Sequence, residues 1–179
     1  ERISDRASAE QLKEACQGAA VTIKKVECKE KSEKPPALYD LTTLQRDANR
    51  LLGFTAQQTL DYLQSLYEKK LCTYPRTDSR YLTGDMADSL PVLVNLVANA
   101  MPFRKGIAIT CDPQTVINDK KVTDHHAVIP TRNLKDADLS ALPAGEKAVL
   151  ELVALRLLCA VAQPHIYSET VVIAACAGG

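Results

Sequence analysis

The chain has 179 residues, of which 46% are hydrophobic, and its 22 basic side chains balance 22 acidic ones. This composition excludes general disorder, and the length suits one ordinary domain or two small interleaved ones. Because the charges cancel, composition gives no support for a nucleic-acid or membrane partner, and either must be inferred from local motifs.

The cysteines lie far apart and never form a C-x-x-C pair, which argues against a zinc knuckle or ribbon and favours a reduced, cytoplasmic compartment. We see no signal peptide and no apolar run long enough to span a bilayer, so we expect no membrane partner. The sequence begins at Glu1 rather than at a methionine and ends at Gly178-Gly179 directly after an apolar run, so we expect a piece of a longer protein. The cysteines are Cys16, Cys28, Cys72, Cys111, Cys159 and Cys176.

The first expected elements are a short helix and a strand. Ser8 to Gln11 has the spacing of a capping box, and Gly18 can end the helix in the left-handed conformation. From Ala20 the sequence is β-branched and then alternates with charge, which predicts a partly exposed strand that ends at Pro35-Pro36.

Two helices with a tight glycine turn between them are expected next. The first begins at the capping-box spacing of Thr42 to Gln45 and ends at Gly53. The second is capped by Thr55, with Gln58 at its third position, and closes at Lys69-Lys70. Together they predict a helix-turn-helix. The predicted apolar stripes are Leu44, Ala48, Leu51 and Leu52 on the first helix and Ala56, Leu60, Leu63 and Tyr67 on the second.

Two more helices are expected in the second half. Pro91 suits the first turn of a helix that runs to about Ala100, after which the chain is irregular as far as Thr131. The segment from Gly145 to Ala162 is apolar on nearly every side, which predicts a buried helix.

The last segment, Tyr167 to Ala177, is expected to form a strand that pairs with the strand near Val21 to Val26. The first and last quarters of the chain would then form one unit, with the middle inserted between them.

The stretch LCTYPRTDSRYL concentrates a phenol, a guanidinium, a carboxylate and hydroxyl groups in a chain that is poor in aromatics. We expect Tyr74 on a short strand after the second helix, which would project Tyr74 and Arg76 from one face toward one bound group. If that group is a phosphate, the arginine forks onto its oxygens while the tyrosine oxygen attacks phosphorus. Asp78 and Ser79 would orient Arg76 or hold the sugar-phosphate chain. Spacing alone favours a plainer alternative, a core tyrosine beside a surface Arg–Asp pair.

The triplet Asp124-His125-His126 is the second candidate. Neighbouring histidines on an extended chain point to opposite faces, so we expect one to serve a site and the other to be structural. The triplet also occurs in manganese-dependent phosphoesterases, but a two-metal site needs further ligands, and the only other histidine of the chain is His165. A hydrogen-bonding role is therefore favoured over a metal site.

Between Leu38 and Thr131 the motifs TLQ, LGFTA, QSLYE, TYPRTDSRYL and DHHAVIPT occur in this order. With these motifs the sequence resembles the central part of a type IA DNA topoisomerase, most closely the bacterial topoisomerase III group. The likeness extends more weakly to both ends, which resemble the β-rich arch of the ring-shaped body of this family. It implies an α+β, mostly helical fragment, in which a catabolite-activator-like helix-turn-helix domain at 38–131 interrupts an arch formed by 1–37 and 132–179.

The resemblance also implies roles for single residues. Tyr74 matches the nucleophile of the family, which attacks single-stranded DNA and becomes linked to a 5′-phosphate. Arg76 matches the arginine that helps to position and stabilise the scissile phosphate, and His125 matches a DNA-contacting histidine. His126 stands where relatives often have another residue, so it receives no role. Further DNA contacts are expected from Thr77, Asp78, Ser79 and Arg80.

The family also has a Toprim domain, which binds magnesium through an acidic cluster and supplies a lysine for cleavage, and nothing in this sequence resembles it. We therefore expect Mg²⁺ to bind outside this chain, in a Toprim domain that is its partner in the full-length, nucleoid-associated, ATP-independent isomerase. Single-stranded DNA is the other expected partner. The isolated chain is expected to be inactive, because a phenol with an ordinary pKa of about 10 is a poor nucleophile near neutral pH.

The alternative to an enzyme fragment is a winged-helix DNA-binding module without chemistry. Such a module needs a basic recognition helix. The expected helix from Ala56 to Lys69 is basic only at its end, which disfavours this alternative.

Overall fold

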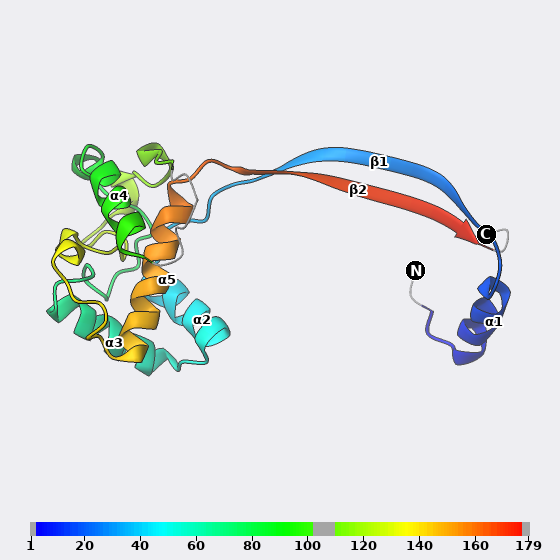
Figure 1. Ribbon diagram of the computed structural model, residues 1–179, viewed down its shortest axis with the longest axis horizontal. Coiled ribbons are helices and arrows are strands. Elements are labelled where there is room, and N and C mark those ends of the chain that lie inside the picture. Colours follow the sequence, from blue (N-terminus) through cyan, green and yellow to red (C-terminus); the bar gives the residue numbers. More distant parts are fainter. Residues whose placement is uncertain (1–2, 102–109, 177–179) are drawn as a thin grey trace. The chain divides into compact units, whose positions relative to one another are not determined.

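The computed structural model describes residues 3–101 and 110–176. The chain divides into two compact units, one formed by Glu1–Glu33 with His165–Gly179 and the other by Lys34–Pro164. Each unit is a continuous structure in Figure 1, the first made from the two ends of the chain and the second from its middle.

The unit formed by the chain ends contains one helix and a two-stranded ribbon. Helix α1 spans Arg6–Cys16, strand β1 spans Val21–Glu33, and strand β2 spans His165–Cys176. The strands are antiparallel over their whole length, with a register that runs from Val21 opposite Cys176 to Glu33 opposite His165. The expected pairing of the first and last strands is therefore confirmed.

The ribbon has one mainly apolar face and one face, called here the charged face, on which charged side chains of β1 lie opposite a mixture of residues from β2. Because side chains alternate across a strand, the paired Val26 and Val172 lie on one face, and the next pair, Glu27 and Val171, lies on the other. The charged face carries an ion pair of 2.8 Å between Lys31 and Glu169. The apolar face is exposed in the described structure, and its members include Val21, Ile23, Val26, Ile166 and Val172.

Helix α1 begins earlier than the capping-box spacing predicts. Its N-cap is Asp5, whose carboxylate accepts a hydrogen bond of 2.8 Å from the backbone N–H of Ser8. Ser8 therefore occupies the third helical position instead of the cap. Gly18 has a positive φ of 74°, which agrees with its expected place just after the helix.

The middle unit is helical. Its helices are α2 (Leu41–Leu52), α3 (Ala56–Glu68), α4 (Leu90–Ala100) and α5 (Ala144–Ala160), with short 3-10 turns η1 (Gly84–Met86), η3 (Pro113–Thr115), η4 (Asp119–Lys121) and η5 (Arg132–Lys135). Helix α5 packs against α2, α3 and α4, as Figure 1 shows within this unit. The buried side chains of α5 are Glu146, Val149, Leu150, Val153, Ala154, Leu157, Leu158 and Ala160, so the buried helix predicted from the sequence is confirmed.

Helices α2 and α3 are joined by a tight turn. The cap of α2 is Asp40, with Thr43 at the third position, so the cap lies two residues before Thr42, where the predicted capping box begins. Gly53 ends α2 with a left-handed φ of 72°, and Thr55 caps α3 with Gln58 as its reciprocal partner, as predicted. The apolar stripes are narrower than expected, because Leu51 and Tyr67 are exposed.

The contact boundary between the two units differs from the expected domain boundary. We expected residues 132–179 to return to the arch, whereas 132–164 pack with the middle unit and only the segment from His165 onward joins β1. The physical reason is α5, whose apolar sides require the core formed by α2, α3 and α4.

The structure is a mixed fold of helices and one two-stranded sheet within the described residues. In residues 3–101 and 110–176, every helix is too short or too polar to cross a bilayer.

Candidate active site

The chain reverses direction directly after α3 and leads into the TYPRTDS stretch. Lys70 adopts a left-handed φ of 60°, and the N–H of Leu71 donates a 2.8 Å hydrogen bond to the carbonyl of Leu66. Cys72 then forms an isolated antiparallel bridge with Pro130. The expected strand is wrong, because pairing stops at this bridge and the backbone bends at Pro75 and Arg76. Proline has no N–H to continue a ladder.

The segment after the histidine pair is held from both sides. The N–H of Val128 donates to the carbonyl of Tyr39 at 2.8 Å, and the N–H of Thr73 donates to the carbonyl of Ile129 at 3.0 Å. The Thr73 hydroxyl adds a 3.1 Å bond to the carbonyl of Ala127. These bonds dock the DHHAVIPT motif beside the TYPRTDS motif, although the two are far apart in sequence.

Tyr74 is half-buried and contacts two other rings. The His125 ring is 4.2 Å from the Tyr74 ring, centroid to centroid, with a tilt of 37°. The Tyr67 ring meets Tyr74 edge to face, with 5.5 Å between centroids and an interplanar angle of 83°. No hydrogen bond joins the Tyr74 hydroxyl to another group in the described part of the chain. The rings of Tyr67 and His125 therefore orient this phenol by packing.

Arg76 does not share a strand face with Tyr74. Its side chain is exposed, and its Nη1 donates a 3.2 Å hydrogen bond to Oε1 of Gln64 on α3. The plainer alternative of an Arg76–Asp78 surface pair is also absent, since the described residues contain no ion pair between them. One of the five guanidinium N–H donors is occupied by Gln64, so a fork remains available for an anion.

Thr77 and Ser79 have buried side chains that bind the protein backbone. The Thr77 hydroxyl donates to the carbonyl of His125 at 2.9 Å, and the Ser79 hydroxyl donates to the carbonyl of Lys121 at 2.8 Å. Their contact with DNA stays a prediction, and the structure gives both hydroxyls a role in fixing the loop that carries His125.

The other two expected DNA contacts differ in exposure. Asp78 is exposed, whereas Arg80 is half-buried and its Nε donates a 3.2 Å bond to the carbonyl of Leu38. His126 is half-buried, with its Nδ1 2.8 Å from the carbonyl oxygen of Ala127. This local contact agrees with a structural role for the second histidine.

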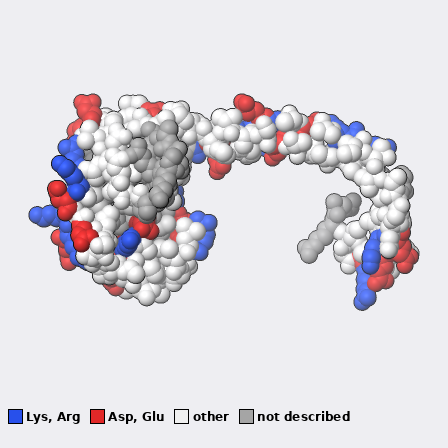
Figure 2. Space-filling view, in the orientation of Figure 1, with Lys and Arg blue, Asp and Glu red and all other residues white. Residues whose placement is uncertain are grey.

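One ion pair links the end of α3 to α5 among the described residues. Lys69, at the end of α3, contacts Glu146 of α5 at 2.5 Å, and the Ser65 hydroxyl donates to the same carboxylate at 2.9 Å. Glu146 is only 7% exposed, so these partners compensate its burial. On the face shown in Figure 2, basic and acidic side chains are interspersed in each unit and form no large basic patch.

A second polar cluster lies where α2, α5 and the segment before α2 meet. The Tyr39 hydroxyl donates to the Asp47 carboxylate at 2.7 Å, and Arg156 contacts both Asp47 and, at 3.0 Å, the Tyr39 oxygen. Burial, together with the Asp47 carboxylate, raises the pKa of Tyr39 to about 12. Burial alone would raise the pKa of Asp47, but hydrogen bonds from Tyr39 and Arg50 and the charge of Arg156 outweigh it and lower that pKa.

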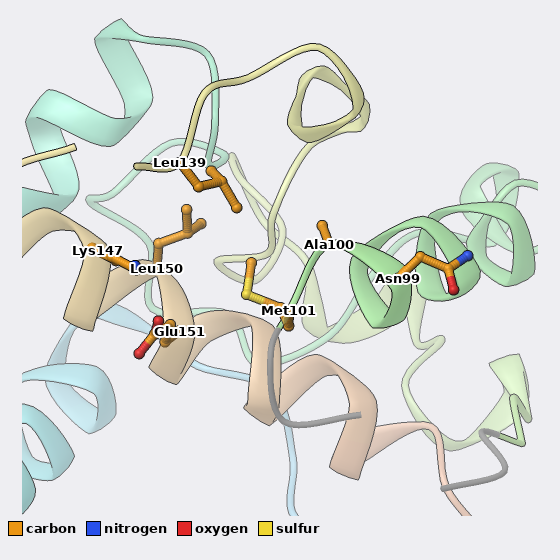
Figure 3. Close-up of a pocket in the computed structure, with 7 residues that line it drawn as sticks. All are labelled: Asn99, Ala100, Met101, Leu139, Lys147, Leu150 and Glu151. Carbon is orange, nitrogen blue, oxygen red and sulfur yellow. The ribbon is translucent and has the colours of Figure 1, made fainter. Parts of the chain in front are cut away.

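Two pockets lie near the end of α4, away from Tyr74. One has a volume of about 290 Å³ and is drawn in Figure 3; the other has a volume of about 550 Å³. Neither is lined by Tyr74, Arg76 or His125. The first is lined by Asn99, Ala100, Met101, Leu139, Lys147, Leu150 and Glu151.

No group of three or more histidine, cysteine, aspartate or glutamate side chains that could hold a metal ion occurs in residues 3–101 and 110–176. These residues therefore do not fit a Mg²⁺ site, and no chemical step of this chain is assigned to a metal.

Sequence reasoning missed two residues of the site. Tyr67 was predicted to lie in the apolar stripe of α3, yet its ring contacts Tyr74. Gln64 received no role, yet its side chain accepts a hydrogen bond from Arg76. Both lie on the last two turns of a helix that ends in a tight reversal before Tyr74. That arrangement is the signal that could have indicated them.

The sequence model of the DNA topoisomerase family matches residues 1–179, and the chain belongs to this family. Among curated relatives, DNA topoisomerase 3 of Shouchella clausii is 43% identical over 165 residues, which cover 88% of this chain and 22% of that protein. DNA topoisomerase 3 of Bacillus licheniformis is 40% identical over 176 residues, which cover 94% of this chain and 24% of that protein.

A solved structure agrees with this family. Full-length topoisomerase I from Thermotoga maritima is similar with a TM-score of 0.66 and 25% identity, over 90% of this chain and 26% of that one. The chain thus spans about a quarter of the length of the proteins that it matches. The expected family, the type IA topoisomerases with topoisomerase III as the nearest group, is confirmed.

Proposed function

We propose that the chain is the tyrosine-bearing part of a type IA DNA topoisomerase that cleaves single-stranded DNA, passes a strand through the break and rejoins it. The single observation that carries this proposal is the position of Tyr74, whose ring packs against Tyr67 and His125 in a chain of this family. Within the described residues, Arg76, two positions further on, uses one guanidinium donor for Gln64, which leaves others for a phosphate.

The proposed reaction uses the Tyr74 oxygen as a nucleophile. That oxygen forms a bond to phosphorus of the DNA backbone while the bond from phosphorus to the 3′ oxygen breaks. The phosphate stays attached to the DNA through its 5′ oxygen. The phenol loses its proton, and the departing 3′ oxygen gains one to become a hydroxyl. Rejoining is the reverse attack by the 3′ hydroxyl, which restores the phenol. The cycle consumes no nucleotide, because the phosphotyrosine bond conserves the energy of the phosphodiester.

The other side chains support the phosphate and the loop. Arg76 would fork onto the non-bridging oxygens, where negative charge gathers during attack. His125, whose ring contacts the Tyr74 ring, would contact the DNA beside it. Asp78 and Arg80 lie at or near the surface and remain proposed DNA contacts, whereas Thr77 and Ser79 would act mainly by holding the loop.

Mg²⁺ and a Toprim domain belong to the proposal for the full-length protein. Type IA topoisomerases are generally Mg²⁺-dependent, and the described residues do not fit a site for that ion. We place the ion in a Toprim domain of the same full-length polypeptide, so the isolated chain is expected to be inactive.

The scaffold is proposed to match the resemblance seen in the sequence. Helices α2 and α3 with their glycine turn would form the catabolite-activator-like helix-turn-helix, and β1 with β2 would belong to the arch. A winged-helix regulator without chemistry gains no support, because the exposed side of α3 carries Asp61 and Glu68 and its terminal Lys69 is paired with Glu146.

The test is covalent capture on single-stranded DNA. The full-length enzyme is incubated with Mg²⁺ and a labelled oligonucleotide, denatured and digested, and the nucleotide-bearing peptide is located by mass spectrometry. We expect the adduct on Tyr74 through a 5′-phosphate, and no adduct in Tyr74→Phe. Tyr81→Phe is the matched control and should form the adduct normally. Attachment at another tyrosine, survival of the adduct in Tyr74→Phe or linkage through a 3′-phosphate would contradict the proposal.

A further inference from the structure

Tyr67 is an exposed ring at a position where the sequence suggested a core residue. It lies in the last turn of α3, and 40% of its surface is exposed. Its neighbours Leu63 and Leu66 fill the core and anchor the helix. The ring of Tyr67 is therefore only partly covered, unlike these two core side chains.

The backbone reversal after α3 brings this ring to Tyr74. The N–H of Lys70 donates to the carbonyl of Tyr67 at 2.8 Å, and the left-handed φ of Lys70 turns the chain back along the helix end. The ring of Tyr74 then meets the Tyr67 ring edge to face at 5.5 Å. Edge-to-face contacts of this kind are the favoured geometry of aromatic pairs.

Tyr74 has few other restraints on its side chain. Its backbone lies between an isolated bridge and a bend, and no hydrogen bond fixes its hydroxyl in the described structure. The rings of Tyr67 and His125 contact it at two different angles, 83° and 37°. Two contacts at different angles limit rotation of the Tyr74 ring more than either contact alone.

We propose that Tyr67 is a positioning residue for the nucleophile, which holds the Tyr74 ring so that its oxygen points at the scissile phosphorus. This inference rests on the proposed function of Tyr74. Tyr67 acts through Tyr74, and its own hydroxyl takes no part. Because an attack on phosphorus needs the nucleophile close and in line, an error of about 1 Å can reduce the rate by up to about 100-fold.

The test compares Tyr67→Leu and Tyr67→Phe in the full-length enzyme. The readouts are the single-turnover rate of adduct formation at saturating enzyme and the Kd for the same labelled oligonucleotide, measured with Tyr74→Phe added to prevent cleavage. We expect Tyr67→Leu to lower the rate by roughly 10- to 100-fold with an unchanged Kd. Tyr67→Phe keeps the ring and should restore the parental rate.

Tyr167→Leu is the matched control, because Tyr167 is 41% exposed and stacks on His165 in the other unit. It should cleave at the parental rate. A parental rate in Tyr67→Leu, a loss that Tyr67→Phe does not restore, or a loss explained by a weaker Kd would overturn the inference. The last result would instead indicate that Tyr67 stacks on a DNA base.

Failure of the proposed function gives a different result. If Tyr74→Phe still forms the adduct, the nucleophile is assigned wrongly, whatever Tyr67 does. If Tyr74→Phe abolishes the adduct while Tyr67→Leu behaves like the parent, only the positioning role is wrong.

Discussion

The ring of Tyr74 lies against the ring of His125, with 4.2 Å between their centroids. This contact joins the TYPRTDS and DHHAVIPT motifs, which are remote in sequence. It depends on backbone bonds, in particular those from Val128 to Tyr39 and from Thr73 to Ile129. The position of His125 is thus fixed by its segment, and its exposed side chain remains free to meet a substrate.

Replacing His125 by alanine should reduce DNA cleavage without disturbing the fold. The loss of one hydrogen bond to a charged phosphate corresponds to about 1.5–3 kcal/mol, or one to two decades in rate. Single-turnover cleavage by the full-length enzyme measures this effect. His126→Ala is the control, because the His126 ring contacts the neighbouring carbonyl of Ala127, and cleavage should stay near the parental rate. Equal losses of cleavage rate in both variants would show that the two histidines only maintain the loop and that neither contacts the phosphate.

Replacing Arg76 by lysine should keep the charge and lose the fork. If two parallel hydrogen bonds to the phosphate matter, cleavage falls by one to three decades, at about 1.4 kcal/mol per decade. Arg46→Lys, at an exposed position of α2, should have no effect on the same assay. Cleavage at the parental rate in Arg76→Lys would show that the fork is not needed and that Arg76 only bonds to Gln64 at the surface.

Local signals predicted the helices well and their starts less well. Thr55 and Gln58 are the only capping pair of α3, and that start was predicted correctly. At α1 and α2, aspartates just upstream compete for the cap, and Asp5 and Asp40 take it while Ser8 and Thr43 become their partners. Capping patterns of this kind overlap within a few residues, so sequence alone does not choose between them.

The site was predictable as a set of motifs and not as a geometry. The likeness to the family selected Tyr74, Arg76 and His125, whose catalytic roles stay predictions. Their arrangement depends on the bend at Pro75 and on bridges between distant segments, which have no local signature. For the same reason, sequence periodicity placed Arg76 on one strand face with Tyr74, whereas its side chain bonds to Gln64. It also placed Tyr67 in the core, whereas that ring is exposed.

The Asp47 cluster should make this chain less stable in acid. The pKa of Asp47 is lowered in the folded state, so its charge stabilises the fold above the unfolded pKa of about 3.9. This contribution is lost as the pH falls from that value through the folded pKa. Asp47→Asn should therefore lower the Tm of the chain at pH 7 and lower it less at about pH 3. The Tm measured across this range checks the sign, and a difference that grows toward low pH would contradict it.

Arg156, the basic partner of Asp47, gives an independent check of how much this cluster stabilises the fold. Arg156→Met leaves the Asp47 carboxylate half-buried without one of its charged partners, and the loss of hydrogen bonds to a charged group costs about 1.5–3 kcal/mol of unfolding free energy. Arg50→Met removes an exposed partner of the same carboxylate and should cost less than about 1 kcal/mol. Equal costs would show that burial of Arg156 against the Tyr39 ring adds nothing.

Cys72 should report when the candidate site opens. It is buried beside its bridge to Pro130, and burial raises the pKa of its thiol to about 12. Alkylation requires an accessible thiolate, so we expect iodoacetamide to modify the exposed Cys28 of the folded chain and to leave Cys72 intact. Peptide mass spectrometry over time should show Cys72 reacting at least about 100-fold more slowly until urea unfolds the chain. Similar rates for the two thiols without urea would mean that the Cys72–Pro130 bridge, and with it the contact between Tyr74 and His125, is open in solution for much of the time.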